Sequence, residues 1–207
     1  NPFTKLLRQG VNEGRLTERD GSYVQVYYHQ TLGKDTLWFN CPEAGHITSA
    51  ADAESVTEMI LYSRKSAMRI MSFLKERFPG FEEAYIQSFA DIPGIRESYR
   101  LDGEYIMTEK DIEARCRFED AVAQSAYPID IHNEKNLVLI HMDPGEYYEI
   151  PYRCMLPREV DNLLVAGRCV SATFAAQSSM RIQLTCMALG EAAGIAAAMS
   201  PQVKTVD

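Results

Sequence analysis

Three features near the end of the sequence have the residue types and the order of a site for an anion or a cofactor. Gly167 and Arg168 follow the apolar run 162–166, and a segment rich in Ala and Gly begins near Arg181. Glycine lets a ligand approach the backbone closely, and arginine binds phosphate through two parallel N–H donors. The first turn of a helix presents unpaired N–H groups and a partial positive charge. From the residues alone the pattern favours a buried strand and helix with an incidental arginine, and the alternative is a cofactor site.

The usual motifs of metal, nucleophile and phosphate-loop chemistry are missing from the sequence. The cysteines have an odd count and irregular spacing and form no Cys-x-x-Cys pair; they are Cys41, Cys116, Cys154, Cys169 and Cys186. We expect reduced, mostly buried thiols, which favour a cytoplasmic location. The sequence contains no His-Glu-x-x-His, Gly-x-Ser-x-Gly or Gly-Lys-Ser/Thr motif. We therefore expect no metal site, and hydrolase and nucleoside-triphosphatase activities have no motif support.

The overall composition is that of an ordinary globular protein. Of the 207 residues, 46% are hydrophobic and 24% are charged, and the formal net charge is −8. Nucleic acids and anionic membrane surfaces bind basic patches, which this sequence lacks. No apolar run reaches the roughly 18 residues of a membrane span. We expect neither partner. The sequence begins with Asn1-Pro2-Phe3, and we expect it to be a piece of a longer chain.

Residues 1–80 predict a hairpin and a long helix. Residues 22–29 and 36–40 are rich in aromatic and β-branched residues and flank a glycine loop, which is typical of two paired strands. Ser49 or Asp52 can cap the helix, and Pro79-Gly80 ends it. Its apolar residues recur at helical spacing: Val56, Ile60, Ala67, Ile70, Met71, Leu74 and Phe78. We expect this stripe to pack in the core.

The middle of the chain predicts short elements. Strands are expected over residues 85–89, 96–101, 104–107 and 137–141. Thr108 can cap a second helix that reaches about residue 123, because its hydroxyl can accept a backbone N–H of the first turn. Residues 127–132 are expected to form a loop.

The last quarter predicts a buried strand followed by a buried helix. Residues 162–167 are a short apolar run that ends in glycine, which is typical of a parallel strand. Residues 181–199 are apolar on nearly all sides of the helix that they predict. Such a helix is expected to be buried rather than amphipathic.

Residues 148–199 carry a long motif. It reads Ile-Pro-Tyr-Arg, Leu-Pro, Asn-Leu-Leu-Val-Ala-Gly-Arg, Ser-Ala, Arg and Thr-Cys-Met-Ala-Leu-Gly-x-Ala-Ala-Gly in this order. The motif resembles the C-terminal region of a bacterial family of FAD-dependent oxidoreductases. Residues 94–100 (GIRESYR), 103–105 (GEY) and 127–132 (YPIDIH) also resemble signatures of that family. The resemblance is specific over residues 85–199 and only general over residues 1–84.

The resemblance implies an α+β chain that is a fragment of a two-domain, glutathione-reductase-like flavoprotein. Residues 1–147 would form a substrate or cap domain, built on a β-sheet with long helices. Residues 148–207 would supply the strand and helix with which the C-terminus returns to the FAD-binding domain. The implied activity is oxidation or reduction of a small organic substrate, and FAD would carry the hydride or the electrons.

The resemblance also assigns residues to the cofactor. Gly167 and Arg168 would face the FAD pyrophosphate. The helix start from Arg181 to Thr185 would approach the pyrimidine edge of the flavin, where the reduced ring carries negative charge.

The substrate side would include residues from two of the matching segments. Arg96 and Arg100 would bind the substrate, and Asp130 and His132 would be catalytic. The alternatives are surface ion pairs for the two arginines and a hydrogen-bonded loop position for His132.

One departure from the family pattern is large, because the sequence contains no Gly-x-Gly-x-x-Gly fingerprint. An N-terminal segment of the FAD domain would therefore be a missing partner, and we expect this chain alone to bind FAD weakly or not at all and to be inactive.

A different hypothesis is a non-catalytic binding or assembly module that retains the cap domain. A carbohydrate-related activity would need two carboxylates in a cleft, and the 29 acidic residues are too evenly spread to indicate a pair.

Overall fold

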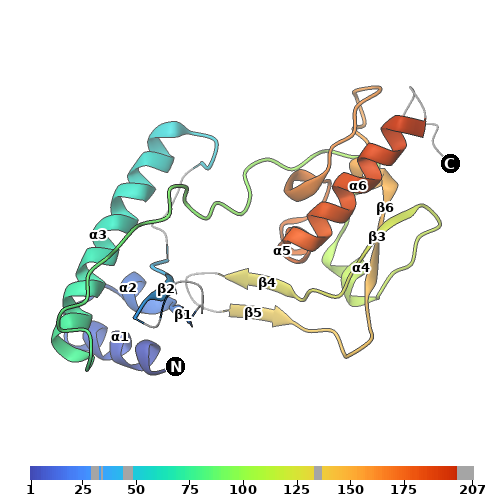
Figure 1. Ribbon diagram of the computed structural model, residues 1–207. Coiled ribbons are helices and arrows are strands. Elements are labelled where there is room, and N and C mark those ends of the chain that lie inside the picture. The colour runs from blue at the N-terminus through green and yellow to red at the C-terminus, as the bar shows by residue number, and fades with distance from the viewer. Residues whose placement is uncertain (29–32, 34, 44–48, 133–136, 200–207) are drawn as a thin grey trace. The chain divides into compact units, whose positions relative to one another are not determined.

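The chain folds as a mixed α+β protein (Figure 1). This computed structural model describes residues 1–28, 33, 35–43, 49–132 and 137–199, without the side chains of residues 132 and 137–139. Within that part, the strands form three two-stranded antiparallel sheets. The chain divides into two compact units, Asn1–Ile95 and Arg96–Asp207. The predicted division into 1–147 and 148–207 concerns membership of a cofactor domain and stays a prediction.

The unit Asn1–Ile95 contains the hairpin and the long helix that the sequence predicts. Its elements are α1 (Pro2–Asn12), α2 (Glu18–Ser22), β1 (Gln25–Tyr28), β2 (Leu37–Asn40) and α3 (Ala53–Arg77). β1 and β2 pair antiparallel, with Tyr27 opposite Trp38, which confirms the hairpin. The Asp52 carboxylate accepts the N–H of Ser55 at 2.7 Å, so the helix begins at one of the two predicted caps.

The core of this unit lies where α1 and α2 meet α3. Its buried residues are Phe3, Leu7, Leu16, Val24, Ile70, Phe73 and Leu74. Ile70 and Leu74 belong to the predicted apolar stripe of α3. Gly10 lies at the closest approach of α1 to α3, because a Cβ there would be 2.7 Å from Phe73.

The unit Arg96–Asp207 contains the remaining elements. They are α4 (Glu109–Glu113), β3 (Ala121–Ser125), β4 (Ile129–His132), β5 (Leu137–Ile140), β6 (Tyr148–Pro151), the 3₁₀ turns η2 (Tyr152–Met155) and η3 (Gly167–Cys169), α5 (Phe174–Met180) and α6 (Gln183–Met199). β3 pairs with β6, and β4 pairs with β5, which confirms the predicted strand near 137–141. α6 lies against β3, and α5 contacts β4 (Figure 1).

The strands predicted over 85–89, 96–101 and 104–107 are not formed in the structure. In and next to these segments the structure has isolated bridges, Gly103 with Pro157 and Met107 with Ala172, and single backbone hydrogen bonds such as that from the N–H of Leu101 to the carbonyl of Cys169. A strand is defined by its ladder of pairs, and strand preference alone does not supply a neighbour. The prediction was wrong for that reason.

The second helix is much shorter than predicted. Thr108 does cap it, in a reciprocal arrangement with Asp111, but α4 ends at Glu113. Arg115 has a left-handed backbone (φ 55°), and its side chain donates to the carbonyl of Glu113 at 2.7 Å. These features end the helix, since a left-handed residue does not continue a right-handed helix. Residues 121–125 form β3 instead, and the predicted loop over 127–132 contains β4.

The predicted strand over residues 162–167 is also absent from the structure. Val165 donates its N–H to the carbonyl of Met155 at 3.0 Å, but no ladder follows. The following helix was expected to begin near Arg181, and α6 begins at Gln183, after a bend of 90° from α5. Its predicted burial is wrong, since four apolar side chains are 54–75% exposed: Leu184, Met187, Ile195 and Met199.

Candidate functional site

The short helix α5 carries a run of buried polar side chains. The Thr173 hydroxyl caps it by accepting the N–H of Ala176 at 3.2 Å. Gln177 is 2% exposed, and its Nε2 donates to the carbonyls of Arg96 at 3.3 Å and Arg168 at 3.2 Å. One buried amide therefore joins two segments that carry predicted site residues.

Two serines of the same helix fix the chain at β4. The backbone N–H of Asp130 donates to Ser178 Oγ at 3.1 Å. Ser179 Oγ donates to the Tyr127 carbonyl at 2.6 Å and lies 2.7 Å from the Tyr148 hydroxyl. Burial raises the pKa of Tyr148, so that hydroxyl stays protonated at neutral pH.

Arg181 and Asp130 form an ion pair at the bend between α5 and α6. Arg181 Nη2 lies 3.5 Å from Asp130 Oδ2 and donates to the Asp130 carbonyl at 3.0 Å. Arg181 Nε donates to the carbonyl of Ser178 at 3.2 Å. The two charged side chains are only 12% and 14% exposed. The structure thus brings together one residue predicted for the flavin side and one predicted for the substrate side.

The electrostatics of this pair include a second arginine. Burial lowers the pKa of Arg181, and the charge of Arg96 lowers it further, while Asp130 acts in the opposite direction. Arg96 is therefore close enough for its charge to act on Arg181, although its own side chain is exposed. Two arginines and two carboxylates, Asp130 and Glu97, thus act on one another at this place.

Thr185 does not face the surface. It is 3% exposed, and its Oγ1 donates to Ser125 Oγ on β3 at 3.2 Å. This bond ties the first turn of α6 to the sheet. The hydroxyl of Thr185 is therefore engaged within the protein, whereas the first N–H groups of a helix lack intrahelical partners.

Gly167 and Arg168 lie at the surface of the unit, in η3. Gly167 has a positive φ of 85°, which favours glycine, and no atom lies within 4 Å of a Cβ built on it. Arg168 is exposed, and η3 contacts α6. Burial raises the pKa of the nearby Cys186 thiol, and the charge of Arg168 opposes that rise. This turn combines open space, an exposed guanidinium and a neighbouring helix.

The remaining predicted residues lie outside this cluster or outside the described side chains. Arg100 forms an ion pair with Glu97, three residues before it. The backbone of His132 ends β4, but its side chain is outside what the structure describes.

Sequence reasoning missed the polar residues that assemble the cluster, namely Gln177, Ser178 and Ser179. A signal for them was present, because three adjacent polar residues interrupt an otherwise apolar stretch behind the cap-forming Thr173. Polar residues are rarely buried without partners, so such a run indicates a hydrogen-bonded junction.

Two further findings concern the described residues. They include no group of three or more His, Cys, Asp or Glu side chains that could hold a metal ion. None of their helices is by itself long and apolar enough for a membrane span; α5 and α6 reach that length and composition only as a pair bent by 90°.

Comparison with known proteins identifies the family. Searches of curated proteins and of solved structures gave no match. The family model described as FAD dependent oxidoreductase matches residues 3–206, which is almost the whole chain, and members of this family are enzymes. The chain therefore belongs to the family of FAD-dependent oxidoreductases.

Proposed function

We propose that residues 96–207 form one side of the FAD site of an oxidoreductase that acts on a small organic substrate. The observation that carries the proposal is the surface turn at Gly167 and Arg168, which lies against α6. An exposed guanidinium beside open backbone suits a pyrophosphate oxygen, and the first turn of a helix suits negative charge. FAD, when bound, would supply the hydride or electron transfer.

The fit of FAD to these residues is partial. Gly167 leaves space for a ligand, since a Cβ there would meet nothing within 4 Å. The side chains of Arg181 and Thr185 do not fit direct contact with the cofactor, because they are engaged with Asp130 and Ser125. In this proposal, Arg181 instead holds the bend that orients α6, and the Asp130–Arg181 pair is a positioning feature.

The sequence contains no candidate motif for binding the adenosine part of FAD. The dinucleotide fingerprint Gly-x-Gly-x-x-Gly does not occur among residues 1–207. We propose that the dinucleotide-binding unit comes from sequence outside these residues, and that the chain by itself is inactive. The exposed apolar face of α6 supports the same proposal, since unpartnered apolar surface of this kind is typical of contacts with another domain.

Flavin binding by the purified chain tests this proposal. We expect no stoichiometric flavin absorbance after purification and weak binding in a fluorescence titration. FMN should compete with FAD while adenosine should not, because adenosine has neither the flavin ring nor the phosphates that these residues would bind. Arg168→Ala should weaken binding by about tenfold, as expected for one charged hydrogen bond.

Arg158→Ala is the matched control, because Arg158 is also an exposed arginine of this unit and binds Asp102 and the Gly103 carbonyl rather than belonging to the turn at Gly167. Competition by adenosine equal to that by FMN would contradict the assignment of the flavin side. No binding of FAD or FMN at any accessible concentration would favour the alternative of a non-catalytic assembly module.

A further inference from the structure

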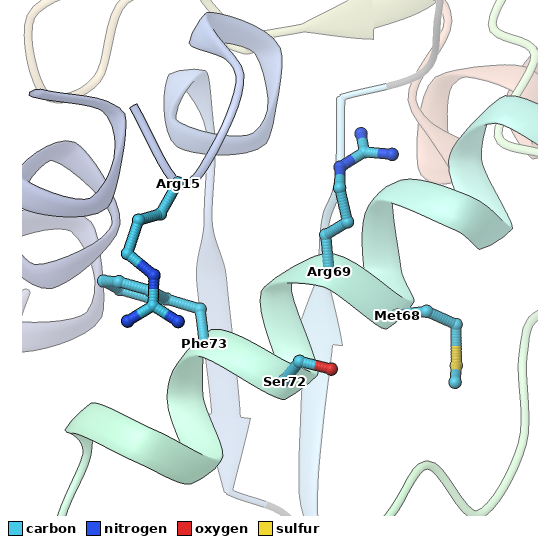
Figure 2. Close-up of a pocket in the computed structure, with 5 residues that line it drawn as sticks. All are labelled: Arg15, Met68, Arg69, Ser72 and Phe73. Carbon is cyan, nitrogen blue, oxygen red and sulfur yellow. The ribbon is translucent and has the colours of Figure 1, made fainter. Parts of the chain in front are cut away.

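A pocket of about 310 Å³ opens on the unit Asn1–Ile95, between the turn after α1 and the middle of α3 (Figure 2). It is lined by Arg15, Met68, Arg69, Ser72 and Phe73. Its volume is at the lower end of the range for small-molecule sites. None of the residues predicted from the sequence as functional lies in it.

The lining of this pocket is cationic. It contains two arginines and no carboxylate. Arg15 Nη2 binds Glu76 at 2.6 Å, and Arg69 binds Asp20 through Nε at 3.1 Å and Nη2 at 2.9 Å. A guanidinium has five N–H donors, more than these contacts use. Both arginines therefore retain the capacity to bind an anion while they keep their acidic partners.

Both cations are held in place before any ligand arrives. Asp20 is fully buried, and its hydrogen bonds with Arg69 raise the pKa of that guanidinium, which stays charged. The guanidinium of Arg15 lies over the ring of Phe73, 5.4 Å from its centroid (Figure 2). A side chain that is already held in place loses less conformational freedom on binding than a freely moving one.

The same pocket has an apolar wall. Phe73 lines the pocket although it is 3% exposed as a residue, and Met68, which is 55% exposed, lines it as well. Ser72 adds one hydroxyl. Inorganic anions gain nothing from such a wall, whereas an anion with an apolar body buries its own surface there.

We propose that this pocket binds a small organic carboxylate, with its anionic group at the guanidinium of Arg15 and its apolar body against Met68 and Phe73. The proposal does not rest on the proposed function, because the residues proposed to face FAD belong to the unit Arg96–Asp207. Failure of one proposal leaves the other standing.

Titration of the full chain with benzoate tests the proposal. The readout is the methyl resonance of Met68 in protein labelled on its nine methionines, so the other methionine methyls serve as internal controls. Benzoate should shift the Met68 resonance saturably. Benzyl alcohol, which has the shape without the charge, and inorganic phosphate, which has the charge without the ring, should each shift it less at the same concentration.

Two variants assign the binding to these residues. Arg15→Gln should weaken benzoate binding by about tenfold. Ser72→Glu should abolish it, because the new carboxylate would take the place of the ligand. Arg77→Gln is the matched control: Arg77 lies on α3 and binds Glu13 at 3.2 Å with 42% of its side chain exposed, but it does not line the pocket.

Three results would overturn the proposal. One is equal binding of benzoate and benzyl alcohol, which indicates a merely apolar groove. Another is binding of phosphate as tight as that of benzoate, which indicates a simple anion contact. The third is the lack of a saturable Met68 shift that depends on Arg15, seen either as no saturable shift or as a loss in Arg77→Gln equal to that in Arg15→Gln. Circular dichroism of each variant excludes unfolding as the cause.

Discussion

At the residue scale, Arg181 is held by acceptors from two elements. The Asp130 side chain provides its counter-ion, and the Ser178 and Asp130 carbonyls accept its other hydrogen bonds. Removing the partner of a buried charge costs far more than removing a surface ion pair. The pair therefore stabilises the bend between α5 and α6, whatever chemistry occurs beside it.

Asp130→Asn should lower the free energy of unfolding by about 3 kcal/mol, because the buried guanidinium loses its counter-ion. Urea unfolding followed by circular dichroism measures this change. Asp102→Asn is the control, since Asp102 and Arg158 form a pair that is 76% and 51% exposed and should contribute less than about 1 kcal/mol. Equal losses in the two variants would show that the Asp130–Arg181 pair behaves as a surface pair.

Asp20 is a buried carboxylate of the unit Asn1–Ile95, and its titration makes the free energy of unfolding depend on pH. Burial by itself would raise the pKa of Asp20, but hydrogen bonds from Arg69, Ser66 and Thr17 outweigh it and hold the pKa below the ordinary value of 3.8. The carboxylate is thus more acidic in the folded state than in the unfolded state. Its contribution to stability is complete above pH 3.8 and is lost as the pH falls through the folded pKa.

Comparison of the wild type with Asp20→Asn measures this contribution. Unfolding followed by the fluorescence of Trp38, which is the single tryptophan and lies in the same unit, gives the free energy at each pH. The wild type should exceed the variant by the same amount from neutral pH down to about pH 4, and the difference should shrink at lower pH. A difference in unfolding free energy that stays the same at every pH would contradict the lowered pKa of Asp20 in the folded state.

At the element scale, Gly10 sets the distance between α1 and α3. A Cβ at this position would lie 2.7 Å from Phe73 Cζ and 2.8 Å from Leu16 Cδ1. Gly10→Ala should therefore lower the unfolding free energy of this unit by about 1–3 kcal/mol through overpacking.

Gly190→Ala on α6 is the matched control, because nothing lies within 4 Å of a Cβ there. Alanine in an open helical position should stabilise the helix by about 0.5–1 kcal/mol. The Trp38 transition should shift down for Gly10→Ala and stay in place for Gly190→Ala. A neutral Gly10→Ala would show that Phe73 moves aside without cost.

Elements with strong local signals could be predicted from the sequence, and elements that depend on distant partners could not. Asp52 and Pro79-Gly80 bound α3 by local capping and by loss of a backbone donor, so its ends were visible. Residues 162–167 have the composition of a strand, but pairing requires a neighbour that composition does not specify. α4 ends early because Arg115 adopts a left-handed conformation. Left-handed backbone is uncommon for arginine, so the sequence gives no sign of it.

In the candidate site too, features with a local cause could be predicted from the sequence, and features that depend on distant residues could not. Gly167 was predicted as a close-approach position, and its positive φ gives a local reason for glycine. Thr185 was predicted to face the cofactor, yet its hydroxyl bonds Ser125, sixty residues away in sequence. Which face of a helix turns inward depends on its tertiary neighbours, so an apolar sequence on all sides of α6 could not decide it.

At the scale of the whole molecule, the two units each have their own buried cluster of apolar residues. Outside these clusters, one long helix keeps a large part of its apolar surface in contact with water. On α6, Leu184, Met187 and Ile195 lie within one side of the helix and are 54–75% exposed, while Leu189 is fully buried on another side. Exposed apolar surface that follows one side of a helix is typical of surfaces that contact another domain or another molecule.

Substitutions on this surface should change self-association without changing the free energy of unfolding. Leu184→Gln combined with Met187→Gln should reduce the binding of a dye specific for apolar surfaces and reduce self-association at high concentration. The free energy of unfolding should change by less than about 0.5 kcal/mol, because neither side chain is buried. Leu189→Ala should do the reverse, with a loss of about 2–5 kcal/mol and no decrease in dye binding, since it removes core packing. If the double variant binds as much dye as the wild type, the apolar side of α6 is not the surface that the dye detects. The exposed apolar side of α6 would then no longer support the proposal that a dinucleotide-binding unit packs there.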